Sequence, residues 1–128
     1  MPPPYTLRAS PAAADFDQHG HLNNVAYVKL VQDAAAGHWR AVAPDDLRDT
    51  LTWYVRRHEI DYLKPVRPGD ELDLVTWVGS PTAATWERFV DIRRGAETLA
   101  RARTVWVLVN ADTGRPRRID ARLRDVFG

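Results

Sequence analysis

One segment of this chain, residues 24 to 42, has the apolar periodicity of a long helix, and this segment limits the possible folds more than any other feature. The side chains expected on its buried face recur every three or four residues; they are Tyr27, Val31, Ala34, Ala35, His38, Trp39 and Val42. We expect Asn23 or Asn24 to cap the helix and Pro44 to end it. At about 1.5 Å per residue the helix would be roughly 28 Å long. The small residues at positions 34 to 37 would let a sheet approach it closely.

Strand-like segments joined by tight turns make up most of the remaining chain. Runs of alternating, β-branched or aromatic residues predict strands at 5–9, 52–63, 71–78, 85–93 and 97–110, and residues 119–127 are expected to form a short final helix. The run at 97–110 is apolar on both faces, which predicts an interior strand. A single long helix must bury its apolar face against such a sheet, which gives an α+β domain. An open sheet leaves an edge strand, so we expect a homodimer or homotetramer.

Length and composition narrow the possible partners. The 128 residues fit one domain, spanning 1–128, and a formal net charge of +1 gives no electrostatic reason to expect nucleic acid or an anionic membrane as partner. The sequence contains no cysteine, which excludes disulfides, thiolate metal sites and a cysteine nucleophile. It has neither a membrane-spanning apolar run nor the features of a secretory signal, so we expect a cytoplasmic protein.

The most unusual segment lies just before the predicted helix and reads DFDQHGHLNN from position 15 to 24. Asp15, Asp17, His19 and His21 occupy alternate positions in it. These side chains could be metal ligands, but the positive potential of a helix start disfavours a cation. They could simply cap the helix, which would explain one carboxylate but not two histidines. In the third interpretation a carboxylate attacks a carbonyl or activates water, while unpaired helix amides stabilise the developing oxyanion.

Residues 15 to 27, DFDQHGHLNNVAY, also resemble the D-x-D-x-x-G-H-x-N-N-x-x-Y signature of the 4-hydroxybenzoyl-CoA thioesterase-like branch of hotdog-fold proteins. They are similar to the corresponding motif of acyl-ACP thioesterases. The resemblance continues at residues 60–65, at the Gly69-Asp70 turn and at residues 112–116. It implies a sheet wrapped around one central helix, and hydrolysis of an acyl-CoA or acyl-ACP thioester without metal or organic cofactor.

The resemblance also assigns roles to individual residues. Asp17 matches the catalytic carboxylate, which acts as nucleophile or as general base on water. Asn23 and Asn24 match the asparagines at the helix start, and the backbone N–H of Asn24 is expected to polarise the thioester carbonyl. His21 matches the histidine that orients the aspartate or holds the substrate carbonyl.

The chain differs from the acyl-ACP thioesterases at position 19 and in having no cysteine. His19 stands where acyl-ACP relatives often have an asparagine, so it is assigned only to substrate binding. Those relatives also carry a catalytic cysteine, and its absence favours the CoA branch. Tyr27 is expected either to line the acyl pocket or to pack in the core.

Several other side chains have two interpretations each. Arg93 and Arg94 could meet CoA phosphates or form an exposed turn. Of His58 and Glu59 only one can face inward, and a structural role is favoured. Core or dimer-surface positions are expected for four tryptophans, Trp39, Trp53, Trp77 and Trp86.

Two other functions are compatible with the same fold. A hotdog hydratase or dehydratase would be expected to carry an Asn-Pro element or a His/Glu pattern, and the segment at 15–24 lacks Asn-Pro. A non-catalytic acyl-CoA binding module would need the pocket but not Asp17.

Overall fold

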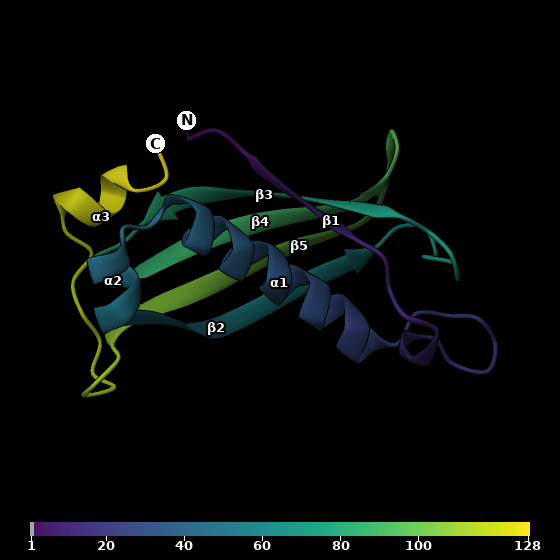
Figure 1. Ribbon diagram of the computed structural model, residues 1–128, viewed down its shortest axis with the longest axis horizontal. Coiled ribbons are helices and arrows are strands. Elements are labelled where there is room, and N and C mark those ends of the chain that lie inside the picture. Colours follow the sequence, from purple (N-terminus) through teal and green to yellow (C-terminus); the bar gives the residue numbers. More distant parts are fainter. Residues whose placement is uncertain (1) are drawn as a thin grey trace.

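A five-stranded antiparallel sheet curves around the long helix α1 in the computed structural model, which describes residues 2–128 (Figure 1). The strands follow the order β1-β3-β4-β5-β2 across the sheet. Their bounds are Tyr5–Ala9 for β1, Leu51–Tyr62 for β2, Leu72–Pro81 for β3, Thr85–Arg94 for β4 and Glu97–Asn110 for β5. The helices are α1 at Asn24–Val42, α2 at Asp45–Thr50 and α3 at Ala121–Asp125, with a 3-10 turn η1 at Ala13–Asp15. The expected α+β class is confirmed, and so is the interior position of β5.

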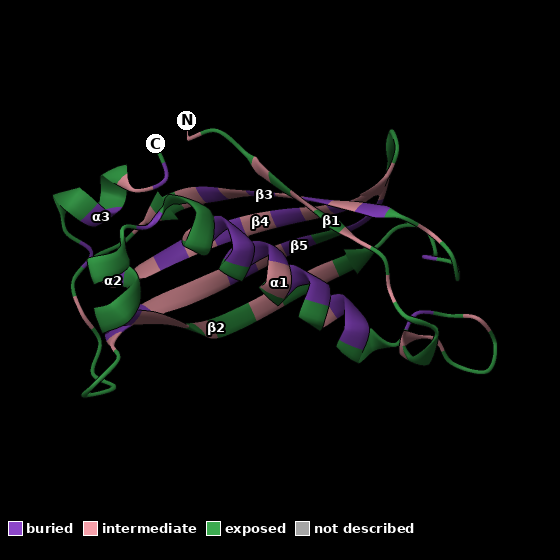
Figure 2. Cartoon of the chain, in the orientation of Figure 1, coloured by how far each residue is buried: buried purple, intermediate pink, exposed green. Residues whose placement is uncertain are grey.

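The helix α1 lies against the concave face of the sheet and turns its apolar side toward the strands (Figure 2). On β3 the residues Leu72, Leu74, Thr76 and Val78 are buried and the residues between them are less so, as expected for a strand with one face on the core. A Cβ added at Gly37 would lie 3.5 Å from the Tyr5 ring, because β1 crosses α1 at this point. The small-residue stretch of the helix therefore does permit the predicted close approach.

The helix α2 was not expected from the sequence. Pro44 ends α1 as predicted, but its carbonyl then accepts hydrogen bonds from the amides of Leu47 and Arg48 and so starts another short helix. Leu47 is the one buried residue of α2 and joins an apolar cluster with Trp86, Leu108, Ile119, Leu123 and Phe127. This cluster closes the end of the molecule at which α1 finishes, and a second one, around Leu30 and Val31, fills the other end.

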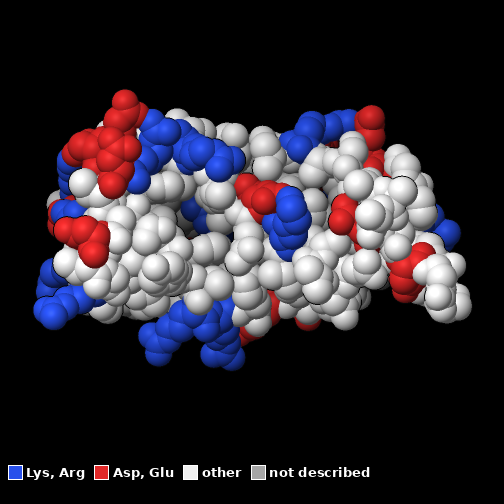
Figure 3. Space-filling view, turned by 60° about the horizontal axis from the view of Figure 1, so that its bottom comes forward, with Lys and Arg blue, Asp and Glu red and all other residues white. Residues whose placement is uncertain are grey.

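The strand β2 forms one edge of the sheet and pairs only with β5 among the described strands. Its pairing shifts by one residue between Val55 and Arg57. Three large side chains of this region, Tyr54, Tyr62 and Leu63, are each more than half exposed. Within residues 2–128, no helix is both long enough and apolar enough to cross a bilayer. The face shown in Figure 3 carries both acidic and basic side chains, including an acidic group at its upper left and a basic group on its lower edge.

Candidate active site

The loop that carries the unusual polar segment is a tight turn between Phe16 and Leu22, which pair as an isolated antiparallel bridge. The amide of Asp17 donates to the carbonyl of His21 at 2.8 Å, and the amide of Gly20 donates back to the carbonyl of Asp17 at 3.0 Å. Gly20 has a φ of 75°, a left-handed conformation that glycine adopts without steric cost. Backbone bonds thus hold the loop in a defined shape immediately before α1.

The Asp17 carboxylate is fixed by two backbone amides. Its Oδ1 accepts hydrogen bonds from the N–H of His19 at 2.8 Å and from the N–H of His21 at 3.0 Å. The bond from His21, supplemented by the one from His19, lowers the pKa of Asp17 below its usual value, because both bonds favour the ionised carboxylate. The other oxygen, Oδ2, lies 4.0 Å from Nδ1 of His21, and the side chain is 41% exposed. Asp17 is therefore an ionised, oriented carboxylate that a substrate can reach.

The first turn of α1 begins at Asn24, three residues after His21, whose amide donates to this carboxylate. Asn23 is the N-cap, as expected, but its side chain makes no capping hydrogen bond, and its amide donates to the carbonyl of Asp15 at 2.8 Å. The carbonyl of Asn23 accepts from the amides of Ala26 and Tyr27. Within residues 2–128 the amides of Asn24 and Val25 have no acceptor, which leaves them available for a developing oxyanion.

The remaining residues of the motif differ in burial and in their contacts. His19 and His21 are both exposed, with ring centroids 6.3 Å apart. Tyr27 is buried in the core with its ring edge-to-face against Tyr62 at 4.9 Å, and burial raises its pKa. Asp15 accepts a hydrogen bond from the amide of Ala12 and is turned toward η1. No cluster of three potential metal-ligating side chains occurs in the part of the chain described, so the four alternating residues do not converge on one ion.

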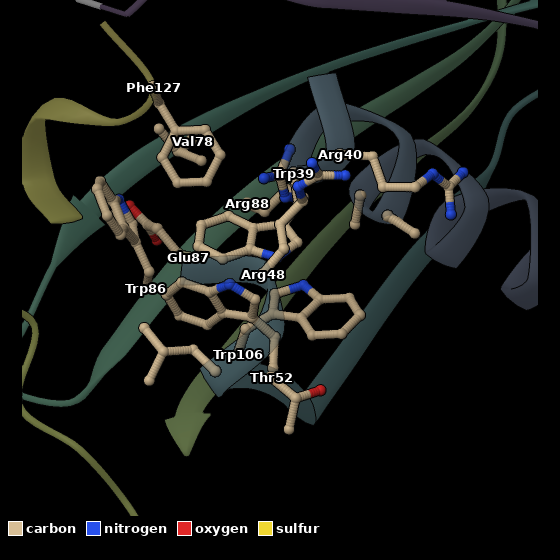
Figure 4. Close-up of a pocket in the computed structure, with 14 residues that line it drawn as sticks. Trp39, Arg40, Arg48, Thr52, Val78, Trp86, Glu87, Arg88, Trp106 and Phe127 are labelled. Atoms are coloured by element: carbon tan, nitrogen blue, oxygen red, sulfur yellow. The ribbon is translucent and has the colours of Figure 1, made fainter. Parts of the chain in front are cut away.

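A cavity of about 380 Å³ lies at the opposite end of α1 from the Asp17 loop (Figure 4). Aromatic side chains make up much of its lining: Trp39, Trp53, Trp86, Trp106 and Phe127. Ala35, Ala36 and Arg40 of α1 also border it, so it lies at least eleven residues along the helix from Asn24. One chain therefore does not bring the candidate nucleophile and the large cavity together. Volumes of this order are typical of small-molecule sites.

A buried polar network borders the same cavity. Nη1 of Arg88 lies 2.9 Å from Nδ1 of His38 and donates to Oγ1 of Thr76, also at 2.9 Å. All three side chains are buried, and the guanidinium lies 5.2 Å from the centroid of the Phe127 ring. Burial, reinforced by the Arg88 charge, lowers the pKa of His38 to about 4. His38 is therefore neutral at neutral pH and accepts the Arg88 hydrogen bond at Nδ1.

The sequence profile of the Thioesterase-like superfamily matches residues 11–127. The chain belongs to this superfamily. No curated protein sequence matches it.

Solved structures of several thioesterases have the same hotdog fold. A Thermus thermophilus thioesterase complexed with coenzyme A and zinc has 24% identity and a TM-score of 0.85, over 99% of this chain and 98% of that one. A probable thioesterase from Bartonella henselae has 21% identity and a TM-score of 0.82, over 92% and 100%. A 1,4-dihydroxy-2-naphthoyl-CoA thioesterase from Synechocystis has 16% identity and a TM-score of 0.82, over 98% and 96%. These similarities confirm the hotdog fold, and superfamily membership supports thioester hydrolysis as the general activity.

Two features of this thioesterase-like chain were missed by sequence reasoning. Trp86 lies in the core as expected, and Trp39 and Trp53 pack against that core, but it was not expected that all three also line a cavity together with Trp106. Arg88 was not noticed, although the sequence holds a signal for it. It alternates in phase with Trp86, Val90 and Ile92, all of which are buried, so its position on the inner face follows from the strand period.

Arg94, the second residue of the basic pair at the β4–β5 hairpin, has two acidic partners. Arg94 donates to Asp70 at 2.7 Å and to Glu97 at 3.2 Å, and these bonds raise its pKa. Its guanidinium therefore links the β4–β5 turn to the turn before β3. On β2, His58 pairs with the buried Thr104 and shares its inner face, whereas Glu59 pairs with Arg103 on the outer one.

Proposed function

We propose that this chain hydrolyses an acyl-CoA thioester, with Asp17 as the attacking or water-activating carboxylate. The observation that carries the proposal is the position of Asp17. Its carboxylate is ionised and held by the amides of His19 and His21. His21 stands three residues before a helix start whose Asn24 and Val25 amides are unpaired within residues 2–128. The residue assignments extend the general activity that superfamily membership supports.

The reaction needs few groups because a thiolate is a good leaving group. As nucleophile, Oδ2 of Asp17 adds to the thioester carbonyl carbon, the carbonyl oxygen becomes negative, and the amide of Asn24 donates to it. The C–S bond then breaks, the thiolate takes a proton from solvent, and water hydrolyses the mixed anhydride to free acid and Asp17. As general base, the same carboxylate takes a proton from a water that attacks the carbonyl directly. His21 and His19 border the reacting group in both routes, and Asn23 fixes the start of the helix.

Coenzyme A is the carrier that we favour over acyl carrier protein. The Thermus thermophilus structure contains coenzyme A, which supports a CoA thioester for the present chain as well. The sequence also lacks the cysteine that marks the resembling acyl-ACP thioesterases.

We also propose that the working unit contains two copies of the chain. The Asp17 loop and the tryptophan-lined cavity lie at opposite ends of α1, so a short acyl group would reach both only if the loop of one protomer lies beside the cavity of its partner. The twelve-residue edge strand β2 offers an unpaired row of backbone groups within the described chain. Exposed Tyr54 and Tyr62 on β2, Leu63 directly after it, and Val25 at 80% exposure provide apolar surface for a partner to cover.

Thiol release from acyl-CoAs tests the role of Asp17. We expect Asp17→Asn to lower the rate by about a hundredfold or more, the scale of a lost general base or nucleophile. Asp15→Asn is the matched control, since Asp15 is two residues away and caps η1; it should keep most of the rate. Binding of an acyl-CoA without thiol release by the wild type would favour a binding module instead. Hydration of an enoyl-CoA without thiol release would favour a hotdog hydratase.

A further inference from the structure

Arg88 combines burial with an absence of negative partners. Its residue is 5% exposed, and no Asp or Glu within residues 2–128 forms an ion pair with it. Its hydrogen-bond acceptors, His38 and Thr76, are both neutral. A buried cation without an anion is costly, so such a group normally has a charged partner.

The guanidinium also has hydrogen-bonding capacity left over. Both hydrogens of Nη1 are used by His38 and Thr76, while Nη2 and Nε have no acceptor in the described chain. Neither of these nitrogens is among the fully sealed polar atoms that lack a partner, so they keep access to the cavity that Arg88 lines. Figure 4 shows Arg88 among the side chains that line the cavity.

Other charged groups around the cavity are already paired or exposed. Glu87 borders it, but its carboxylate is bonded to Arg103 at 3.0 Å and to the amide of Ser80. Arg48 pairs with Asp45, and Arg40 is exposed to solvent. A hollow on the face shown in Figure 3 contains basic atoms. Among the lining residues that the structure describes, Arg88 is therefore the one buried and unneutralised charge.

We propose that the cavity binds an acyl group that has a flat, apolar body and ends in a carboxylate, and that this carboxylate pairs with Arg88. The guanidinium would donate from Nη2 and Nε, the fork geometry that suits a carboxylate. The tryptophans and Phe127 would pack on the apolar body, and about 380 Å³ accommodates one or two aromatic rings. The substrate class is then a thioester of a dicarboxylic acid with an aromatic or similarly flat body. This inference rests on the proposed function for its link to catalysis but not for binding.

Binding is tested first without any reaction. The probe is 4-(methylcarbamoyl)benzoate, in which an amide replaces the thioester, and the comparison compound is N,4-dimethylbenzamide, in which a methyl group replaces the carboxylate. Quenching of tryptophan fluorescence and calorimetry report occupancy, because four of the five tryptophans line the cavity. We expect the carboxylate to bind at least about tenfold more tightly to the wild type, as for a charge-assisted hydrogen bond. Equal affinity for the two compounds would overturn the proposal.

Variants locate the charge that is responsible. Arg88→Met should abolish the carboxylate preference, while Arg88→Lys should keep part of it. Arg48→Met removes another guanidinium of the lining and should keep the preference, since Arg48 already pairs with Asp45. A preference lost in Arg48→Met and kept in Arg88→Met would contradict the assignment. If Arg88→Met does not fold, the ratio of the wild-type affinities for the two compounds still tests the proposal. The change of this ratio in Arg88→Lys and in Arg48→Met then shows which guanidinium is responsible.

Turnover separates this inference from the proposed function. Wild-type kcat/KM for terephthaloyl-CoA should exceed that for 4-methylbenzoyl-CoA by about tenfold or more, and Arg88→Met should remove the difference. If both thioesters are hydrolysed equally, the inference fails and the thioesterase proposal stands. If the carboxylate preference in binding depends on Arg88 but no thioester is cleaved, the cavity assignment stands and the thioesterase proposal fails.

Discussion

Two backbone amides determine the protonation state of the proposed catalytic carboxylate. The N–H of His21, and with it the N–H of His19, holds the pKa of Asp17 below the ordinary value of 3.8. The carboxylate is therefore already ionised at mildly acidic pH, and a nucleophile or general base must be ionised to act. We expect kcat/KM to stay level between about pH 5 and 7 and its acid limb to lie below 3.8.

A dithiodipyridine dye follows thiol release across this range, and parallel circular dichroism shows where the protein remains folded. Substitution of Gly20 by alanine is a useful companion, because the left-handed φ of 75° strains any residue with a Cβ. It should displace the amides of His19 and His21 and move the acid limb upward. An acid limb near neutral pH in the wild type would contradict Asp17 as the titrating group.

At the level of residues, the sequence predicted the loop chemistry better than the cavity. Residues 15 to 27 are contiguous, so their motif places Asp17 beside the helix start without knowledge of the fold. The cavity draws its lining from α1, α2, β2, β3, β4, β5 and the C-terminus, and its shape depends on long-range packing. Strand alternation could have predicted that Arg88 lies on the inner face. It could not have predicted that Arg88 lacks a carboxylate partner, because that depends on neighbours distant in sequence.

Among the elements, α1 has the predicted bounds, but its last turn departs from the predicted buried face, because Val42 was expected to be buried and is 36% exposed. Within the helix, the residue of low helix propensity is Gly37. The residue lies inside the helix under β1, with the nearest atoms of Tyr5 and Leu7 at 3.5 and 3.6 Å from an added Cβ, which is ordinary contact. Gly37→Ala should therefore stabilise the protein by about 0.5–1 kcal/mol through helix propensity. Gly37→Leu should destabilise it, because the larger side chain would displace β1.

Urea unfolding followed by far-ultraviolet circular dichroism measures both changes, provided that the slope with denaturant is the same as in the wild type. A Gly37→Ala variant less stable than the wild type would mean that α1 and β1 pack too closely to accept an added methyl group. A Gly37→Leu variant as stable as the wild type would mean that β1 is easily displaced.

The prediction of elements succeeded for α1 and for the strands, including the five residues of β1, but it missed the short helix α2 and the 3-10 turn η1. Residues 24 to 42 span five helical turns and gave the bounds of α1 correctly, and the fourteen residues of β5 were likewise identified. The six residues of α2 are too few for a periodic pattern, and only Leu47 among them is buried. Its formation depends on the Pro44 carbonyl and on the tertiary contacts of Leu47, which local sequence does not reveal.

For the whole molecule, the decisive question is whether one active site is shared by two chains. If a site combines the Asp17 loop of one protomer with the cavity of its partner, two differently disabled variants should complement each other. Asp17→Asn removes the carboxylate, and Ala36→Trp places a bulky ring at the cavity, since Ala36 is exposed and borders it. Each variant alone should have lost most of its activity.

In a mixed dimer, one site would receive both defects and the other neither. The intact site would combine Asp17 from the Ala36→Trp chain with the open cavity of the Asp17→Asn chain. Random association of equal amounts makes half of the dimers mixed, so about a quarter of the wild-type activity should return, as two-fold symmetry requires. The chains are exchanged by mild denaturation and refolding, and thiol release is compared before and after mixing.

Size-exclusion chromatography with light scattering provides the necessary control, because both variants must retain the oligomeric state of the wild type. If each chain instead forms its own complete site, every protomer in the mixture carries one defect and no activity returns. That result, with dimers intact, would place both the carboxylate and the acyl group within one protomer. It would then require the substrate to extend along α1 from the Asp17 loop to the tryptophan-lined cavity, a path of at least about 16 Å for eleven residues of helix. Because the flat aromatic acyl group proposed for the cavity is shorter than that path, return of activity on mixing is the expected outcome.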